Sequence, residues 1–217
     1  MNRLVKIFLI GLLISFLGSL PLGTLNMTAF QIAGFQNVSE AMLYALAVVF
    51  VELVVVRITL AYSKKIDLGN RVFFYLLPIA IALLMYLSVS SFTSLKDDQA
   101  IQAGSNLFPM LKSSILLGLL LSFLNPMHIP FWTTWNSVLI AKNRLDRKPG
   151  MYTSYITGIG IGSIGGLMIF VFAGKYIFQN YHEYSYVIAF ILGCLYLGFS
   201  FYLLFLLYKN HLKLIIH

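Results

Sequence analysis

The stretch Gly11-Leu-Leu-Ile-Ser-Phe-Leu17 recurs almost unchanged as Gly118-Leu-Leu-Leu-Ser-Phe-Leu124, and this repetition decides the predicted fold. The two copies are 107 residues apart, about half of the 217-residue chain. Each copy lies in an apolar run, and the same shift brings the later apolar runs of the first half approximately onto those of the second. The sequence therefore predicts a single domain over 1–217, built from two related halves, roughly 1–107 and 108–217.

The apolar runs indicate an integral membrane protein. Hydrophobic residues make up 59% of the chain and charged residues only 10%, whereas a soluble domain carries about a quarter charged residues. A helix needs roughly 20 apolar residues to cross the hydrocarbon core of a bilayer. We therefore predict an all-α membrane protein with six transmembrane helices. The predicted spans are 4–22, 39–62, 72–91, 113–141, 151–173 and 185–208, and the predicted loops include 31–37 and 174–184.

Both copies of the repeat are followed by residues that interrupt a helix. Pro21 and Gly23 follow the first copy, and Pro126 and Pro130 follow the second. Proline removes a backbone donor and glycine lowers helix propensity, and backbone groups freed at membrane depth need protein or a water-filled cavity to satisfy them. Two halves of three spans each must have opposite orientations. We thus expect a 3+3 inverted repeat with broken helices 1 and 4, an architecture that is common in secondary transporters and has its site at the breaks.

The first break supplies four candidate substrate-binding residues. A half-helix that starts near Pro21 and Gly23 would direct free N–H groups and a positive dipole end at an anionic group of the substrate. Thr24 and Asn26 could add hydrogen bonds. An ordinary helix end, a kink or an extracellular turn is the structural alternative.

The second break supplies three more candidates, Asn125, Pro126 and His128. The Asn125 amide can donate and accept hydrogen bonds, and His128 could bind substrate or carry a proton near neutral pH. A lone histidine among apolar residues is more often a structural group, so the alternative stays open.

Glu52 is the acid that lies inside an apolar run, and it is the candidate for proton coupling. A rise of about 1.5 Å per residue from the run's end near Tyr62 places it roughly 15 Å deep. An intramembrane carboxyl group is costly and indicates function: it could accept the coupling proton or hold a substrate ammonium group. The alternative is a structural partner of Arg57 or of a polar group on another helix. Whether Arg57 is structural or functional stays open.

Glycine and tryptophan residues suggest packing roles. Gly158, Gly162 and Gly166 form two overlapping G-x-x-x-G steps, which permit close helix approach either within the chain or in a homodimer. Trp132 and Trp135 are typical of interfacial anchors, with a place in a cavity wall as the alternative.

The basic residues indicate an orientation with both termini cytoplasmic. Eleven Lys and Arg residues fall on the inner side and three on the outer side, a strong positive-inside bias. Their position between apolar runs explains the net charge of +8 without a nucleic-acid partner, and makes membrane lipid the expected surrounding. The inner residues are Arg3, Lys6, Lys64, Lys65, Arg71, Lys142, Arg144, Arg147, Lys148, Lys209 and Lys213, and the outer ones are Lys96, Lys112 and Lys175.

Two motifs resemble the lysine exporter (LysE) family, which includes homoserine and threonine exporters. Ser19-Leu-Pro-Leu-Gly-Thr-Leu-Asn26, followed by Gly34-Phe-Gln-Asn-Val-Ser-Glu-Ala41, is similar to that family's first-helix motif, although the usual P-G-P appears as Pro21-Leu22-Gly23. Asn125-Pro126 before Phe131 is similar to its fourth-helix N-P motif, and size and helix count also agree. The resemblance implies a multi-pass inner-membrane exporter of amino acids or similar metabolites, driven by proton exchange.

The sequence therefore predicts a proton-coupled secondary transporter for a small-molecule substrate, and not an enzyme. The single cysteine excludes dithiol chemistry, and no cluster has metal-ligand spacing, so we expect no cofactor, metal or catalytic residue. The alternatives are a cation or metal exporter of the same architecture, a membrane enzyme, or a non-transporting assembly factor.

Overall fold

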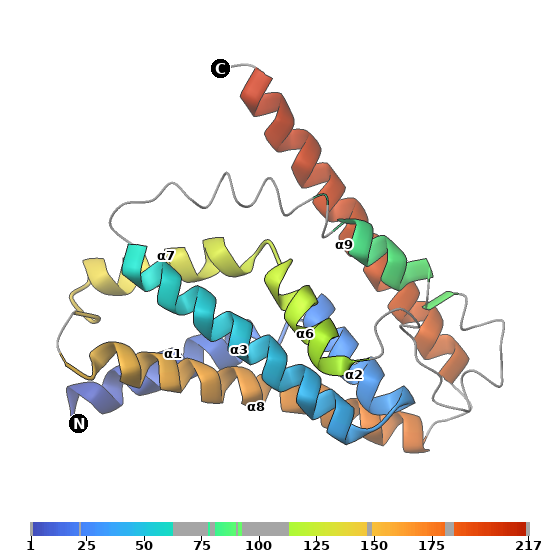
Figure 1. Ribbon diagram of the computed structural model, residues 1–217, viewed down its shortest axis with the longest axis horizontal. Coiled ribbons are helices and arrows are strands. Elements are labelled where there is room, and N and C mark those ends of the chain that lie inside the picture. Colours follow the sequence, from blue (N-terminus) through green and yellow to red (C-terminus); the bar gives the residue numbers. More distant parts are fainter. Residues whose placement is uncertain are drawn as a thin grey trace.

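A computed structural model describes residues 2–21, 23–62, 78, 81–89, 91–92, 113–146, 149–180 and 185–215 (Figure 1). The regular structure in these residues is helical. The helices are α1 (Arg3–Gly18), α2 (Thr24–Phe35), α3 (Val38–Tyr62), α6 (Ser114–Phe123), α7 (His128–Ala141), α8 (Met151–Asn180) and α9 (Ser185–Ile215). Residues 72–77, 79–80 and 90 of the predicted span 72–91 lie outside the described residues, as do the predicted boundary between the halves and several basic residues that set the orientation.

Three long helices have the length and composition of membrane spans. The matching stretches are Val38–Ala61, Met151–Asn180 and Tyr186–Lys209, and the bent pair α6 and α7 makes a fourth if it counts as one span. Large apolar side chains on the outside of these helices are exposed, such as Phe50 and Phe205, each at 63%. Lipid, rather than water, is the solvent that suits such a surface. The chain is a multi-pass, all-helical membrane protein.

Both predicted helix breaks are confirmed. α1 ends at Gly18, and the backbone N–H of Ser19 closes its last turn on the Ser15 carbonyl oxygen at 2.9 Å. Helix resumes at Thr24, three residues after Pro21. α6 ends at Phe123, and α7 begins at His128 in a direction that differs by 61°. Pro130 lies in the first turn of α7, where its missing N–H removes no helical hydrogen bond.

Two predicted loops are partly wrong, because both are helical for much of their length. α2 includes residues 31–35 of the predicted loop 31–37, and α8 continues to Asn180 through much of the predicted loop 174–184. In α2 the polar Gln31 is buried, with hydrogen bonds between its amide group and Ser91 Oγ (3.4 Å) and Tyr196 Oη (3.2 Å). A polar side chain that finds partners in the interior need not mark a loop.

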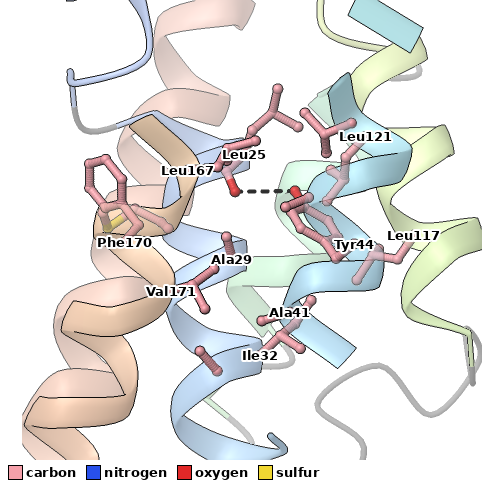
Figure 2. Packing of buried hydrophobic residues seen from close by; sticks show 14 of the residues in the cluster. Leu25, Ala29, Ile32, Ala41, Tyr44, Leu117, Leu121, Leu167, Phe170 and Val171 are labelled. Atoms are coloured by element: carbon pink, nitrogen blue, oxygen red, sulfur yellow. Dashed lines mark hydrogen bonds between the residues drawn. The ribbon is translucent and has the colours of Figure 1, made fainter. Parts of the chain in front are cut away.

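The larger apolar cluster surrounds α2. Figure 2 shows Leu25, Ala29 and Ile32 of α2 between residues of α8 on one side and of α3 on the other. The Tyr44 hydroxyl of α3 donates a hydrogen bond to the Leu25 carbonyl oxygen at 3.2 Å, drawn as the dashed line. α2 is thus a buried half-helix of 12 residues that is too short to span a bilayer alone.

The glycine-rich face of α8 packs against α1 of the same chain, and the two helices lie side by side in Figure 1. A methyl group at Gly158 or Gly162 would collide with the backbone of α1 at Phe8 or Leu12, and one at Gly166 would collide with Ser19 Oγ. The three glycines therefore serve packing within the chain, whereas the predicted homodimer stays a prediction.

An equivalent contact joins α6 to α3. A methyl group at Gly11 of α1 would lie 2.5 Å from the Tyr155 carbonyl oxygen of α8, and one at Gly118 of α6 would lie 2.6 Å from the Tyr44 carbonyl oxygen of α3. One turn later, Ser15 bonds to Ser163 of α8, and Ser122 Oγ donates to the Val48 carbonyl oxygen of α3 at 3.1 Å. The repeated sequence motif thus makes the same kind of helix contact twice.

Candidate functional site

A cavity of about 530 Å³ lies between the two helix breaks. All eight residues predicted for substrate binding and proton coupling line it, although they come from three helices and the two breaks. They are Pro21, Gly23, Thr24, Asn26, Glu52, Asn125, Pro126 and His128. The structure therefore brings together residues that the sequence separates by more than 100 positions.

The first break is held open by Asn26. Its side-chain nitrogen Nδ2 donates to the carbonyl oxygens of Ser19, at 2.5 Å, and Pro21, at 2.9 Å. These are carbonyl groups that the end of α1 leaves without helical donors. No side chain caps the N-terminus of α2 at Gly23, so N–H groups of its first turn are available at the cavity wall, where Gly23, Thr24 and Leu25 lie.

The second break is an asparagine-stabilised turn. Asn125 Oδ1 accepts a hydrogen bond from the Met127 N–H at 3.1 Å, and the Asn125 carbonyl oxygen accepts one from the His128 N–H at 3.3 Å. This use of the Asn125 oxygen atoms leaves its amide N–H groups available. The His128 imidazole atom Nδ1 is buried and has no hydrogen-bond partner among the described residues, which makes it the unsatisfied polar atom of this wall.

Glu52 receives a hydrogen bond at each carboxylate oxygen. Trp132 Nε1 of α7 donates to Oε1 at 3.2 Å, and Ser163 Oγ of α8 donates to Oε2 at 2.5 Å. Because the Ser163 hydroxyl donates its hydrogen to Glu52, its oxygen must be the acceptor in the hydrogen bond with the Ser15 hydroxyl. Glu52 therefore connects α3 to the second broken segment and to α1 and α8 together.

Arg57 does not take part in this network. It is exposed, and it is not among the residues that line the cavity. The described residues contain no ion pair between Arg57 and Glu52, whose carboxylate oxygens are instead hydrogen-bonded to Trp132 and Ser163.

Sequence reasoning missed two members of the site, Ser15 and Ser163, and gave a third only as an alternative. Trp132 is fully buried and lines the cavity, which is the alternative to its interpretation as an interfacial anchor, whereas Trp135 is 38% exposed. Ser15 and Ser163 are buried serines in apolar or glycine-rich helices. Ser15 belongs to the repeated motif, so its recurrence as Ser122 was the available signal. Nothing in the local sequence distinguishes Ser163.

The walls of the cavity determine what it can hold. Glu52 is its one charged lining residue among the described residues, and no Lys or Arg lines it. The polar groups belong to the breaks and to the Glu52 network. Apolar side chains complete the enclosure, among them Leu83, Leu84, Leu121, Phe199 and Leu203. A cavity of this size and composition suits a small organic molecule with one cationic group and an apolar portion.

The described residues contain no group of three or more His, Cys, Asp or Glu side chains that could hold a metal ion. Comparisons of the chain with protein-family models, with curated proteins and with solved structures find no match. The geometry of the cavity is therefore the basis for assigning a function.

Proposed function

We propose that this protein is a secondary transporter that exports amino acids or related small metabolites in exchange for protons. The observation that carries the proposal is the shared cavity, in which two helix breaks and the half-buried carboxyl group of Glu52 face one space. Discontinuous helices around a polar site are the usual construction of a secondary-transport site. The motif resemblance to the LysE family supports export as the direction of transport and the inner membrane as the location.

The cavity chemistry favours an amino acid with a neutral, apolar side chain. The uncapped first turn of α2 offers N–H groups to the substrate carboxylate, and Glu52 offers a partner to its ammonium group. The remaining lining is largely apolar. A lysine side chain would bring a second ammonium group, for which the described residues that line the cavity offer no second acid. An unpaired buried charge is strongly unfavourable.

Competition for one carboxyl group supplies the exchange. A substrate ammonium group and a proton both neutralise Glu52, so the cavity can carry one or the other at low cost through a low-dielectric interior. Trp132 donates to Glu52 from α7. Neutralisation of Glu52, by a proton or by a substrate ammonium group, therefore also changes the strength of the hydrogen bond that joins α7 to α3.

We further propose that the six-helix, 3+3 inverted repeat is the complete architecture, with both termini cytoplasmic. The matching contacts of Gly11 with Tyr155 and of Gly118 with Tyr44 support it. So does a second correspondence: Glu52 follows Tyr44 by eight residues, as Ser163 follows Tyr155. The two side chains at these corresponding positions are hydrogen-bonded to each other.

The test is counterflow of radiolabelled amino acids in proteoliposomes, with and without a pH gradient, comparing the wild type with Glu52→Gln. The glutamine can keep both hydrogen bonds of Glu52: its oxygen can accept from Trp132, and its amide group can donate to Ser163, which then donates to Ser15. The variant should therefore fold and insert. We expect it to lose pH-driven flux, and we expect leucine or methionine to compete in the wild type better than lysine.

The matched control is Glu40→Gln, the same substitution in the first turn of α3, outside the cavity. It should transport as the wild type does. Normal pH-driven efflux from Glu52→Gln would remove Glu52 from the mechanism. A wild-type protein that moves no member of a broad amino-acid panel would contradict the transport proposal itself.

A further inference from the structure

We propose that a second cavity, away from the substrate site, binds the phosphate group of an anionic phospholipid. It has a volume of about 380 Å³ and lies where the start of α1 meets the turn after α7. Three of its six lining residues are cationic. The six are Arg3, Lys6, Ile7, Ile10, Asn143 and Arg144. This inference does not depend on the transport proposal.

The turn after α7 is tightly built, so its contribution to the cavity is fixed in place. Asn143 adopts a left-handed backbone conformation (φ 51°), which asparagine tolerates better than most residues. The N–H groups of Arg144 and Leu145 both bond to the Leu139 carbonyl oxygen, at 2.9 and 3.2 Å. Leu145 is buried. The two hydrogen bonds and the buried Leu145 therefore fix the turn that contains Arg144.

Arg3 joins this turn to α1. Its guanidinium nitrogen Nη2 lies 3.0 Å from Asp146 Oδ2 and donates at 3.0 Å to the Asn143 carbonyl oxygen. Arg3 is thus positioned and largely neutralised by Asp146. For Lys6 and Arg144, the described part of the chain contains no ion pair. The cavity therefore retains two cationic groups that are available to an anion.

The lining identifies the anion as a phosphate group and favours a lipid as its source. Arg presents a planar donor pair that suits phosphate oxygens, and Lys adds a point charge. Below the charged rim the wall is apolar, formed by the buried Ile7 and the half-buried Ile10 of α1. Basic pockets between transmembrane helices are recognised sites for anionic lipid headgroups. The apolar wall contributes nothing to the binding of free phosphate, whereas it can contact the glycerol and acyl portion of a phospholipid.

The experiment measures binding of phosphatidylglycerol to the full chain in phosphatidylcholine nanodiscs by native mass spectrometry, with thermal midpoints followed in parallel by tryptophan fluorescence. The variants are Lys6→Gln and the double variant Lys6→Gln/Arg144→Gln. The control is Lys142→Gln, an exposed basic residue of the same turn that does not line the cavity. Inorganic phosphate at millimolar concentration is the competing probe.

We expect phosphatidylglycerol to bind the wild type and Lys142→Gln equally and to raise both thermal midpoints. Each basic side chain near an anionic surface contributes roughly a fivefold change in affinity. Lys6→Gln should therefore weaken binding about fivefold and the double variant about 25-fold. Equal binding by the double variant, or an equal loss in Lys142→Gln, would overturn the site. Full competition by inorganic phosphate would overturn the lipid as its ligand.

Discussion

Ser163→Ala removes one oxygen atom from the centre of the Glu52 network. The Ser163 hydroxyl donates to Glu52 Oε2 at 2.5 Å and is the hydrogen-bond partner of the Ser15 hydroxyl. Ser163 and Ser15 are each only 2% exposed, so water does not replace the lost partner freely. The substitution leaves the apolar packing of α8 unchanged and deletes two hydrogen bonds.

The two lost hydrogen bonds make separate contributions to the free energy of unfolding. A hydrogen bond to a charged group contributes about 1.5–3 kcal/mol to stability, and a buried hydroxyl without a partner costs about 1–3 kcal/mol. Ser15 can recover part of its loss by bonding back to a carbonyl oxygen of its own helix. We therefore expect Ser163→Ala to lower the free energy of unfolding by about 2–5 kcal/mol, and to slow proton-driven flux because Glu52 loses a fixed partner.

Ser200→Ala is the matched control. Ser200 is a fully buried serine of α9, and its hydroxyl oxygen has no hydrogen-bond partner among the described residues. Removal of an unsatisfied buried hydroxyl should leave stability unchanged or raise it by about 1 kcal/mol. Thermal unfolding in detergent, with counterflow in proteoliposomes, measures both variants. Equal effects of the two substitutions on stability would refute the reasoning, since it assigns the whole cost to the bonded partners of Ser163.

Two further substitutions test the helix contact and the first break. Gly118→Ala should lower the free energy of unfolding by about 1–3 kcal/mol, because its methyl group would lie 2.6 Å from the Tyr44 carbonyl oxygen, a backbone atom that cannot swing aside. Gly198→Ala, which meets nothing within 4 Å, should be neutral or stabilising in the same thermal assay. Asn26→Asp should destabilise the protein more than Asn26→Ala, because it sets a carboxylate against the carbonyl oxygens of Ser19 and Pro21. The reverse order in thermal midpoints would show that Asn26 does not hold the break.

The sequence predicted the helix breaks because their cause is local. Proline and glycine disfavour a helix interior, and their clustering after Leu17 and Leu124 marked the two breaks, although Pro130 and the glycines of α8 show that single residues of these types can lie within a helix. The predicted loop at 31–37 failed for the opposite reason. Gln31 stays in a buried helix because Ser91 and Tyr196, far away in the sequence, satisfy its amide group, and no local pattern contains that information.

The residues of the candidate site also fall into those that the local sequence marks and those that it does not. Glu52 stood out because a carboxyl group in an apolar run is costly, and the break residues stood out through their repetition. The sequence left two places open for Trp132, because tryptophan is common both at membrane interfaces and in cavity walls. The distinction depends on the 61° turn between α6 and α7, which directs Trp132 inward. The sequence marks the bend, but it does not give its direction.

The proposed inverted repeat and proton exchange together account for the pairing of one acid, Glu52, with one hydroxyl group, that of Ser163. Two carboxyl groups in hydrogen-bond contact could not both be ionised in a low-dielectric interior, and two hydroxyl groups would provide no charge to exchange. A hydroxyl group opposite one carboxyl group avoids both outcomes, because it donates to the carboxylate and accepts from the carboxylic acid. Ser163 can therefore remain hydrogen-bonded before and after Glu52 takes up a proton, with Ser15 reversing its own role in step. An alanine or a lysine opposite Glu52 would favour a single charge state, whereas serine lets the same site pass between two.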